Sequence, residues 1–445
     1  MRGLYSLLMW LAQPWLRRKL ARRGRQEPGY LEAVAERFGH YAVPPPPPDG
    51  NTLWVHAVSL GETRTAALLI AGLRARWPGM RLLLTHGTAT GRAEGARLLQ
   101  PGDLQTWQPW DTPSAVQRFL AHFQPRLGIL METEIWPNLV AGCQRQGVPL
   151  VLANARMSAK SQRQAQRLAC LSRPALGALR AVWAQTEADA ERLPQLGASV
   201  QGVFGNLKFD AAPNPAQVAS GRAWRQQAGR PVLLLASSRE GEELALLQLL
   251  VSFKHLGPVD IDSSAIDSGV SGAQWLIVPR HPQRFDAVAA LIEAQGFAVS
   301  RRSAWHDGPP LANESEGRTV WLGDSLGEMA LYYGLADVAL LGGSFEPLGG
   351  QNLIEAAACA CPLVMGPHTF NFAQAAELAE AAGAALRVAA LAPAVAAAQR
   401  LANDPAARAV MVSAATGFAS AHRGALAKTV AAVLALLEQQ GVDAV

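Results

Sequence analysis

The sequence of 445 residues has few cysteines and no long uninterrupted apolar run. Four cysteines in a chain of this length do not make a disulfide framework, and the pair at positions 359 and 361 lacks the second ligand pair that a zinc site needs. Without a run of about 18 apolar residues, a protein with several membrane-spanning helices is excluded. Apolar residues nevertheless make up 49% of the chain, which excludes intrinsic disorder and leaves material for large buried cores.

Several motifs that bind cofactors or metals are also missing. The chain has no G-x-x-x-x-G-K-[ST] phosphate loop and no H-E-x-x-H zinc motif, and no G-x-G-x-x-G fingerprint follows the first predicted strand. These absences argue against an ATPase of the P-loop kind, a zinc protease and an NAD enzyme. Asp260 and Asp262 could chelate a divalent ion, but they lie in a polar stretch at 254–272 that we interpret as a loop insertion. We therefore predict no metal site and no cofactor.

The net charge of +5 is concentrated at the start of the chain. Residues 1–43 hold eight Lys and Arg against three Glu, which accounts for the whole excess. A neutral body with a basic head favours an anionic surface as partner and disfavours nucleic acid.

Residues 3–16 form a short apolar segment with Trp10 and Trp15, and the basic cluster 17–25 follows it. This order is the reverse of a signal peptide. The segment is interrupted by Pro14 and is shorter than the roughly 20 residues that a straight spanning helix needs. We expect an interfacial or shallowly inserted membrane anchor, with tryptophans at headgroup level, arginines on lipid phosphates and the body on the cytoplasmic side. A core helix with a solvated basic face is the alternative.

The rest of the chain alternates short apolar runs with helical patterns. The prolines at 44–48 predict a stiff spacer between anchor and body. Continuous apolar strands that alternate with helices indicate parallel sheets covered on both faces. The pattern restarts near residue 231, after a turn-rich linker at 206–218. We predict a basic anchor segment at 1–43 and two doubly wound α/β domains at 44–210 and 211–445. The predicted strands are 52–58, 80–85, 104–107, 126–131, 149–153, 181–185 and 199–204 in the first domain, and 231–237, 275–279, 319–323, 337–343 and 362–366 in the second.

Polar side chains follow three strands of the first domain. Glu62 comes one turn after the first strand, and it is either a general base or a carboxylate that complements a helix dipole. Glu132 and Glu134 follow the fourth strand, as helix caps or as groups that bind sugar hydroxyls, and Asn154 follows the fifth. Ligands of parallel sheets collect at the carboxyl ends of the strands, so we expect these groups to share one edge.

The second domain has a comparable arrangement. Glycine amides, a helix N-terminus and an arginine can form an anion site without a metal, and Glu355 is placed to bind a ribose diol. We predict a phosphate or nucleotide site here, the alternatives being ordinary turns and a surface ion pair of the arginine. The residues at the strand ends are Ser237, Ser238, Arg280, His281, Gly342, Gly343 and Ser344, and Gly349, Gly350, Gln351 and Asn352 open the next helix.

Eight motifs, taken in order, resemble the bacterial 3-deoxy-D-manno-octulosonic acid (Kdo) transferase family, and the resemblance extends to about residue 385. They are WVHAVSLGE (54–62), METEIWPNL (131–139), NARMS (154–158), GNLKFD (205–210), VPRHP (278–282), GDSLGEM (323–329), GGSFEPLGGQNLIEAA (342–357) and GPHTFNF (366–372). The resemblance implies two Rossmann-like domains that face a cleft (the GT-B fold). It also implies an inverting, metal-independent enzyme that transfers Kdo from CMP-Kdo to lipid IVA, a tetraacylated disaccharide bisphosphate, at the cytoplasmic face of the inner membrane.

The resemblance also implies roles for single residues. Glu62 looks like the general base, Glu132 like an acceptor-side carboxylate, and Arg280 with the loop at 342–352 like the CMP-binding groups, with Glu355 on the ribose. Lys208, Ser237 and Ser238 look like further donor contacts, as does the stretch 368–371. This chain has Gln351 where the family usually has His, which puts a charged role there in doubt. The alternatives are another GT-B enzyme, such as a UDP-sugar 2-epimerase, and a membrane-docked scaffold without activity.

Overall fold

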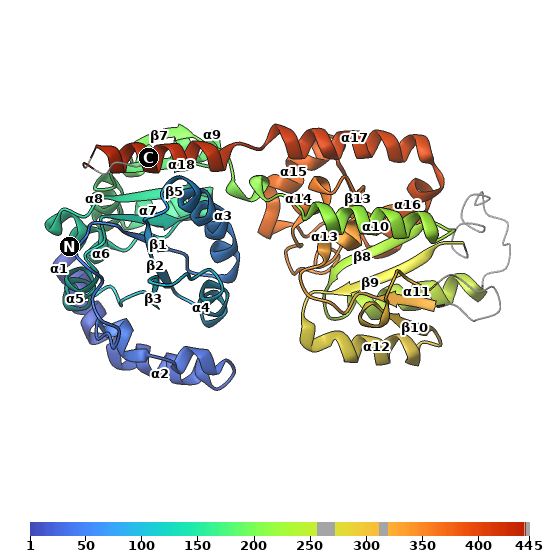
Figure 1. The fold of residues 1–445 in the computed structure, drawn as a ribbon, viewed down its shortest axis with the longest axis horizontal. Coiled ribbons are helices and arrows are strands. Elements are labelled where there is room, and N and C mark those ends of the chain that lie inside the picture. Colours follow the sequence, from blue (N-terminus) through green and yellow to red (C-terminus); the bar gives the residue numbers. More distant parts are fainter. Residues whose placement is uncertain (256–271, 311–318, 440, 442–445) are drawn as a thin grey trace. The chain divides into compact units, whose positions relative to one another are not determined.

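The computed structural model describes the whole chain except residues 256–271, 311–318, 440 and 442–445. Asp260 and Asp262, the candidate chelating pair, lie outside the described residues. The chain forms two compact units, one of Met1–Asp210 with His422–Val445 and one of Ala211–Ala421 (Figure 1). We call them unit 1 and unit 2.

Unit 1 is built on a seven-stranded parallel sheet with the order β3-β2-β1-β4-β5-β6-β7. Every residue of β1 and β4 is buried, because helices cover both faces of the sheet, and this explains why these strands are mostly apolar. The strands are β1 Thr52–His56, β2 Arg81–His86, β3 Leu104–Trp107, β4 Leu127–Met131, β5 Leu150–Ala155, β6 Ala181–Ala184 and β7 Val200–Val203.

Two apolar cores lie on the two faces of this sheet. One contains Leu53 and Val55 with side chains of α3 and α18, and the other contains Trp54 and Phe119 with side chains of α5 and α6. The alternation of successive β1 residues between these cores follows from the two-residue period of a strand. The helices of unit 1 are α1 Arg2–Leu11, α2 Gln13–Gly24, α3 Leu60–Arg76, α4 Ala89–Ala96, α5 Pro113–Phe123, α6 Pro137–Gln146, α7 Ala159–Arg167, α8 Ala169–Gly177, α9 Glu187–Arg192 and α18 Ala425–Glu438.

Unit 2 repeats the architecture with a second seven-stranded parallel sheet, in the order β10-β11-β9-β8-β12-β13-β14. Its strands are β8 Val232–Ser238, β9 Gln274–Pro279, β10 Ala298–Arg301, β11 Thr319–Leu322, β12 Val338–Leu341, β13 Leu363–Met365 and β14 Ala385–Arg387. Its helices are α10 Pro215–Gln227, α11 Glu242–His255, α12 Phe285–Ala294, α13 Met329–Leu335, α14 Leu353–Ala358, α15 Ala373–Ala381, α16 Leu391–Asn403 and α17 Pro405–Ala421. The prediction of two parallel-sheet α/β domains is confirmed.

The end of the chain differs from the predicted domain boundaries. The prediction assigns everything after residue 211 to the second domain, but His422–Val445 belongs to unit 1. The reason is apolar packing, since Val430, Val433 and Leu437 of α18 are buried in the core under α3. Asp210 fixes the start of this segment, because its carboxylate accepts the backbone N–H groups of Gly424 and Leu426 at 2.7 and 2.8 Å.

The start of the chain also differs, because it is packed on unit 1 instead of being held away from it. Glu36 is buried, and its carboxylate accepts Arg92 at 2.7 Å and the backbone N–H of Trp107 at 2.9 Å. The Arg37 guanidinium lies 3.8 Å from the centre of the Trp107 ring. Residues on both sides of the proline run thus belong to one unit, and the predicted spacer between anchor and body is wrong. Among the described residues, no helix has the length and apolar character needed to cross a bilayer.

Candidate active site

Glu62 lies in the first turn of α3, directly after the loop that follows β1. Ser59 is the N-cap of this helix, and its hydroxyl oxygen accepts the backbone N–H of Glu62 at 3.4 Å. The Glu62 carboxylate in turn accepts the Ser59 hydroxyl at 2.9 Å and the backbone N–H of Val58 at 2.9 Å. This reciprocal arrangement closely resembles a capping box, so the helix-end interpretation describes the geometry of Glu62 in this structure.

The pKa of Glu62 also suits a general base. Burial raises the pKa of Glu62 from 4.5 to about 7, and the nearby negative charges of Glu132 and Glu134 add to the rise. The hydrogen bonds from Val58 and Ser59 oppose it by stabilising the ionised form. A carboxylate that titrates near neutral pH can accept a proton from a bound hydroxyl at the pH of the cell. Capping and proton transfer are compatible, because a bound hydroxyl can replace the Ser59 hydroxyl as donor.

Glu132 and Glu134 supply the other carboxylates at this edge. Glu132 follows β4 directly and has a φ of 59°, a left-handed conformation that is strained for a residue with a side chain. Its Oε1 accepts Lys208 Nζ at 3.1 Å. Burial raises the pKa of Glu134, and the charge of Glu132 reinforces the rise. The predicted grouping of Glu62 with Glu132 at one sheet edge is therefore present.

Lys208 lies in unit 1, which matches the predicted first domain. It lies in the 3₁₀ turn Leu207–Asp210 and forms an ion pair with the Glu132 carboxylate. Asn154 holds this turn in place, since its side-chain oxygen accepts the backbone N–H of Leu207 at 3.0 Å. Asn154 is itself buried at the end of β5 with a φ of 53°. The predicted donor role of Lys208 stays a prediction, and what the structure describes is its pairing within unit 1.

In unit 2, the loop after β8 is organised by two buried glutamates. Ser237 has a φ of 56° next to a register shift between β8 and β9, and Ser238 is fully buried. The Ser238 hydroxyl donates to Glu243 at 2.7 Å, and the same carboxylate accepts Arg284 through two hydrogen bonds of 2.7 and 3.0 Å. Ser238 therefore holds the loop in shape, and its hydroxyl is already engaged.

Glu242 corrects one part of the predicted anion site. Its two carboxylate oxygens accept the backbone N–H of Gly343, both at 2.8 Å, and one accepts that of Arg239 at 2.9 Å. The Gly343 amide was predicted to be bare, but a buried carboxylate of the same unit accepts its N–H. Burial raises the pKa of Glu242, while the hydrogen bond from Gly343 is the largest opposing effect.

The glycine-rich loop needs its glycines for close backbone approach. A Cβ at position 342 would lie 2.5 Å from the carbonyl oxygen of Ser237, and Gly343 has a φ of 69°. Gln351 and Arg239 both approach the space above Gly343, at 3.1 and 3.4 Å from the position of a Cβ there. The remaining predicted residues of this loop form turns and caps. Ser344 is buried and donates to the Leu341 carbonyl, and Asn352 caps α14. The Gly350 N–H donates to the Gly343 carbonyl, and the Gly349 carbonyl accepts the N–H of Asn371.

A group of cations surrounds His281 after β9. Burial lowers the pKa of His281, and the positive charges of Arg239, Arg280 and Arg284 lower it further. Arg280 and Glu355 also act together on the buried Tyr333: burial raises the pKa of this phenol, Glu355 adds to the rise and Arg280 opposes it. Unit 2 therefore brings the predicted residues Arg280, His281 and Glu355 into one region.

Arg239 is the site residue that sequence reasoning left out. It directly follows the predicted Ser237 and Ser238, and its position one residue beyond a strand end is the signal that could have found it. Within the part of the chain that the structure describes, no group of three His, Cys, Asp or Glu side chains has the arrangement of a metal site.

Comparisons with known proteins point to one family. A family described as 3-deoxy-D-manno-octulosonic-acid transferase (kdotransferase) matches residues 32–211. A 3-deoxy-D-manno-octulosonic acid transferase of Bordetella pertussis is 46% identical over 440 residues, which cover 97% of this chain and 98% of that protein. A protein of the same name from Haemophilus influenzae is 32% identical over 382 residues, 83% of each chain. The crystal structure of a glycosyltransferase from Rickettsia africae aligns with a TM-score of 0.53 at 13% identity, over 88% of this chain and 98% of that one, and this likeness shows the fold alone.

Proposed function

This chain belongs to the 3-deoxy-D-manno-octulosonic acid (Kdo) transferase family, and from this premise we propose how its residues carry out the transfer. It is a glycosyltransferase that transfers Kdo in lipopolysaccharide biosynthesis. The proposed donor is CMP-Kdo, and the proposed acceptor is lipid IVA. The Bordetella and Haemophilus transferases match most of the chain and therefore favour Kdo transfer over the epimerase and scaffold alternatives.

The observation that carries the mechanism is the Glu62 carboxylate, whose pKa of about 7 suits a base. In the proposed step, Glu62 takes the proton of an acceptor hydroxyl. The hydroxyl oxygen forms a bond to the anomeric carbon of Kdo while the bond from that carbon to the phosphate oxygen breaks. CMP leaves with the electron pair of the broken bond. Attack from the face opposite the phosphate inverts the anomeric centre.

The leaving phosphate needs positive charge, which unit 2 provides. We assign Arg280 and Arg239 to this role because each directly follows a strand of unit 2, β9 and β8, and because the positive charge of both lowers the pKa of His281. Preorganised cations stabilise charge that develops as the bond to phosphate breaks. Glu355, in the first turn of α14, is the proposed partner of the ribose.

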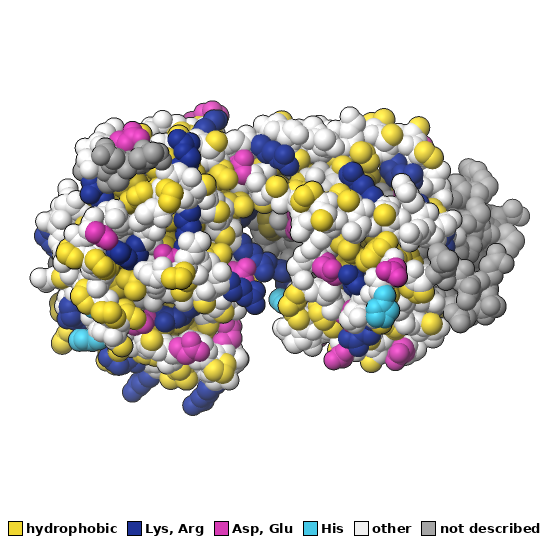
Figure 2. Space-filling model, viewed as in Figure 1, with side chains coloured by type: hydrophobic (Ala, Val, Ile, Leu, Met, Phe, Trp, Pro, Cys, Tyr) yellow, Lys and Arg dark blue, Asp and Glu magenta, His cyan; other side chains and the backbone are white. Residues whose placement is uncertain are grey.

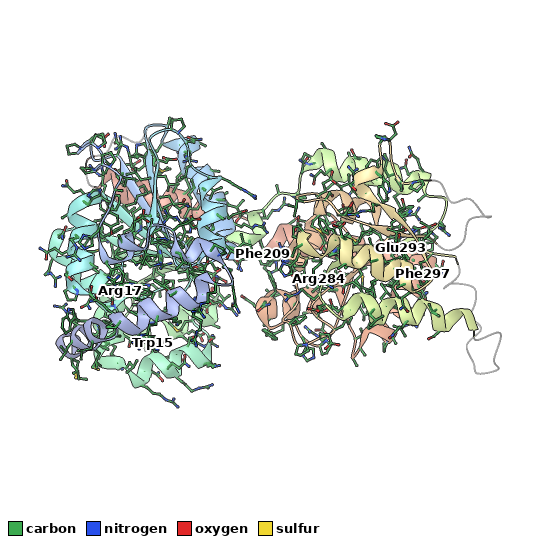
Figure 3. The ribbon with its side chains drawn as sticks, turned by 90° about the horizontal axis from the view of Figure 1, so that it is seen from below. Trp15, Arg17, Phe209, Arg284, Glu293 and Phe297 are labelled. Carbon is green, nitrogen blue, oxygen red and sulfur yellow. The ribbon has the colours of Figure 1, made fainter. Side chains whose placement is uncertain are left out.

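We further propose that α1 and α2 bind the surface of the inner membrane on its cytoplasmic side. Leu4, Leu7, Leu8 and Leu11 follow the spacing of one helix face and are each more than half exposed, from 51% to 57%. Lys and Arg side chains project from the region of α2 (Figure 2), and Figure 3 marks Trp15 and Arg17 in this helix. An apolar ridge beside cations suits an interface of anionic lipids.

The transfer is tested by incubating the purified full-length enzyme with CMP-Kdo and lipid IVA and measuring the mass of the lipid product. A product heavier by one or more Kdo residues supports the proposal, and no product from an enzyme that binds CMP refutes it. Arg280→Ala is expected to weaken CMP binding at least about tenfold, as the loss of a charge-assisted hydrogen bond predicts. Glu62→Gln is expected to leave CMP binding near the wild-type value.

The membrane proposal is tested by sedimentation with vesicles of phosphatidylethanolamine and phosphatidylglycerol. Leu8→Glu is expected to reduce the bound fraction, because it places a charge in the apolar ridge. Val410→Glu is the matched control, since Val410 lies in unit 2 and is 72% exposed. Equal sedimentation of both variants and the wild type would contradict the proposal.

A further inference from the structure

Helix α7 carries cations in an unusually acid-free part of the chain. Between Glu134 and Glu187 the sequence has no Asp or Glu but seven Lys and Arg. Four of them, Arg156, Lys160, Arg163 and Arg167, are spaced by four, three and four residues. Residues three and four apart lie on the same side of a helix, so Lys160, Arg163 and Arg167 form a single row along α7. Arg156 lies between β5 and this helix, three residues before Ala159. We refer to these four residues as the α7 row.

No carboxylate neutralises the α7 row within the described part of the chain. Lys160, Arg163 and Arg167 are exposed and Arg156 is half-buried, and none of the four forms an ion pair with a described residue. The neighbouring turn after α9 contacts α7 through neutral groups, since Gln162 donates to Gln195 at 2.8 Å. Like charges at these spacings destabilise a helix by a few tenths of a kcal/mol per pair. Helix α7 also buries none of its residues, so an anion from outside the chain can reach these cations. Such an anion would relieve the uncompensated repulsion between them.

The α7 row begins at the sheet edge that holds the proposed base. Arg156 follows β5, and its backbone N–H donates to the carbonyl of Glu132 at 3.2 Å. Strand β5 lies beside β4, which lies beside β1, the strand that leads to Glu62. With neighbouring strands about 4.8 Å apart, the α7 row starts on the order of 10 Å from β1.

The other end of the α7 row leads toward the proposed membrane helix. Helix α8 follows α7 after Leu168, which is 58% exposed. Cys170 and Pro174 of α8 line a cavity of about 100 Å³ together with Arg2 of α1. A helix of nine residues is roughly 14 Å long. The α7 row therefore starts at the carboxylate edge and ends next to α8, the helix that shares this cavity with α1.

We propose that the α7 row binds a phosphate of the glycolipid acceptor and thereby orients its sugar toward Glu62. The inference rests on the proposed function, in which the acceptor is a disaccharide bisphosphate with apolar chains. Such a molecule needs cations beside the base for its phosphates and an apolar surface farther away for its chains. Guanidinium groups suit this task because they bind phosphate oxygens in pairs.

The test compares Arg163→Gln/Arg167→Gln with Arg145→Gln/Arg173→Gln, a control that removes the same charge from the same acid-free stretch. Both are assayed in uncharged detergent micelles with lipid IVA and with its two derivatives that each lack one phosphate. The α7 variant is expected to raise the KM for lipid IVA about tenfold or more, with kcat and the KM for CMP-Kdo unchanged. For one of the two monophosphoryl acceptors, the α7 variant should have nearly the same KM as the wild type. The control should match the wild type.

Three results would overturn the inference. The KM for lipid IVA could stay unchanged, which would make the α7 row an ordinary solvated surface. The KM could instead rise by the same factor for lipid IVA and for both monophosphoryl acceptors, which would exclude a specific phosphate contact. The variant could also keep its KM in micelles but lose binding to phosphatidylglycerol vesicles, which would assign the α7 row to phospholipid headgroups. A wild-type enzyme without turnover on lipid IVA would instead refute the proposed function, so the two failures are distinguishable.

Discussion

Replacing Glu62 by Gln separates the two roles that its geometry permits. Gln keeps the size of Glu and can still accept the backbone N–H of Val58 at the start of α3. It can also donate to the Ser59 hydroxyl, so the cap of the helix is retained. Gln cannot take up a proton at neutral pH. The variant should therefore fold normally and fail in the chemical step.

The expected magnitudes follow from the pKa of about 7. Loss of a general base typically reduces the rate by about 10²–10⁴. In the wild type, the ionised fraction of Glu62 falls to roughly 10% at pH 6, so kcat/KM should fall about tenfold for each pH unit below neutrality.

The free energy of unfolding should also depend on pH. Because burial raises the pKa above 4.5, protonated Glu62 stabilises the fold below pH 4.5, and this contribution is lost as the pH rises through about 7.

The difference between 4.5 and about 7 corresponds to roughly 3 kcal/mol as an upper limit. Glu62→Gln lacks this titration, so it should approach the wild-type stability near pH 4.5 and exceed it by up to about 3 kcal/mol at pH 8.5. Initial rates of Kdo transfer between pH 5.5 and 8.5, with urea unfolding at the same pH values, give both quantities. A variant with more than about a tenth of the wild-type rate would refute the assignment of the base. A variant less stable than the wild type at pH 8.5 would show that the carboxylate acts chiefly as a cap.

Further expectations concern the framework around the two sites. Glu243→Gln should lower the free energy of unfolding of unit 2 by about 3 kcal/mol in a urea titration, because it leaves the partly buried Arg284 without its charged partner. Gly342→Ala should destabilise the same unit and reduce CMP binding, since the new Cβ would lie 2.5 Å from a backbone carbonyl oxygen of β8; wild-type melting behaviour would contradict this. Tyr5→Phe removes the 2.9 Å hydrogen bond from the phenol to Asp111, so hydrogen exchange of α1 should speed up by the equivalent of about 1 kcal/mol while unit 2 is unaffected.

Much of the fold could be predicted because both sheets are parallel. A strand buried on both faces is mostly apolar, as in Leu82–Leu84 of β2, and such runs stand out from the amphipathic helices between them. The two strands that were missed, β10 and β14, lack this signature. Both pair on one side only at the edges of the second sheet, and Ser300 and Arg387 show how polar they are.

The sheet-edge location of the candidate residues was equally predictable, because a parallel sheet gathers its strand ends at one edge. Their hydrogen-bond partners were not. That Glu242 occupies the Gly343 amide depends on two segments about one hundred residues apart. That Lys208 pairs with Glu132 depends on the turn that Asn154 anchors. Spacing along the chain carries no information about such contacts.

The sequence by itself determined the two-domain α/β architecture, the order of most strands along the chain and the edges at which polar groups gather, because periodicity and strand polarity are local properties. Only the tertiary structure decided that α18 returns to unit 1, that residues 28–38 pack against the first sheet, and that Glu62 is half-buried near two other carboxylates. Burial and charge at a residue depend on what long-range packing brings to it. The pKa of Glu62, on which the proposed chemistry depends, is therefore a property of the fold and not of the motif.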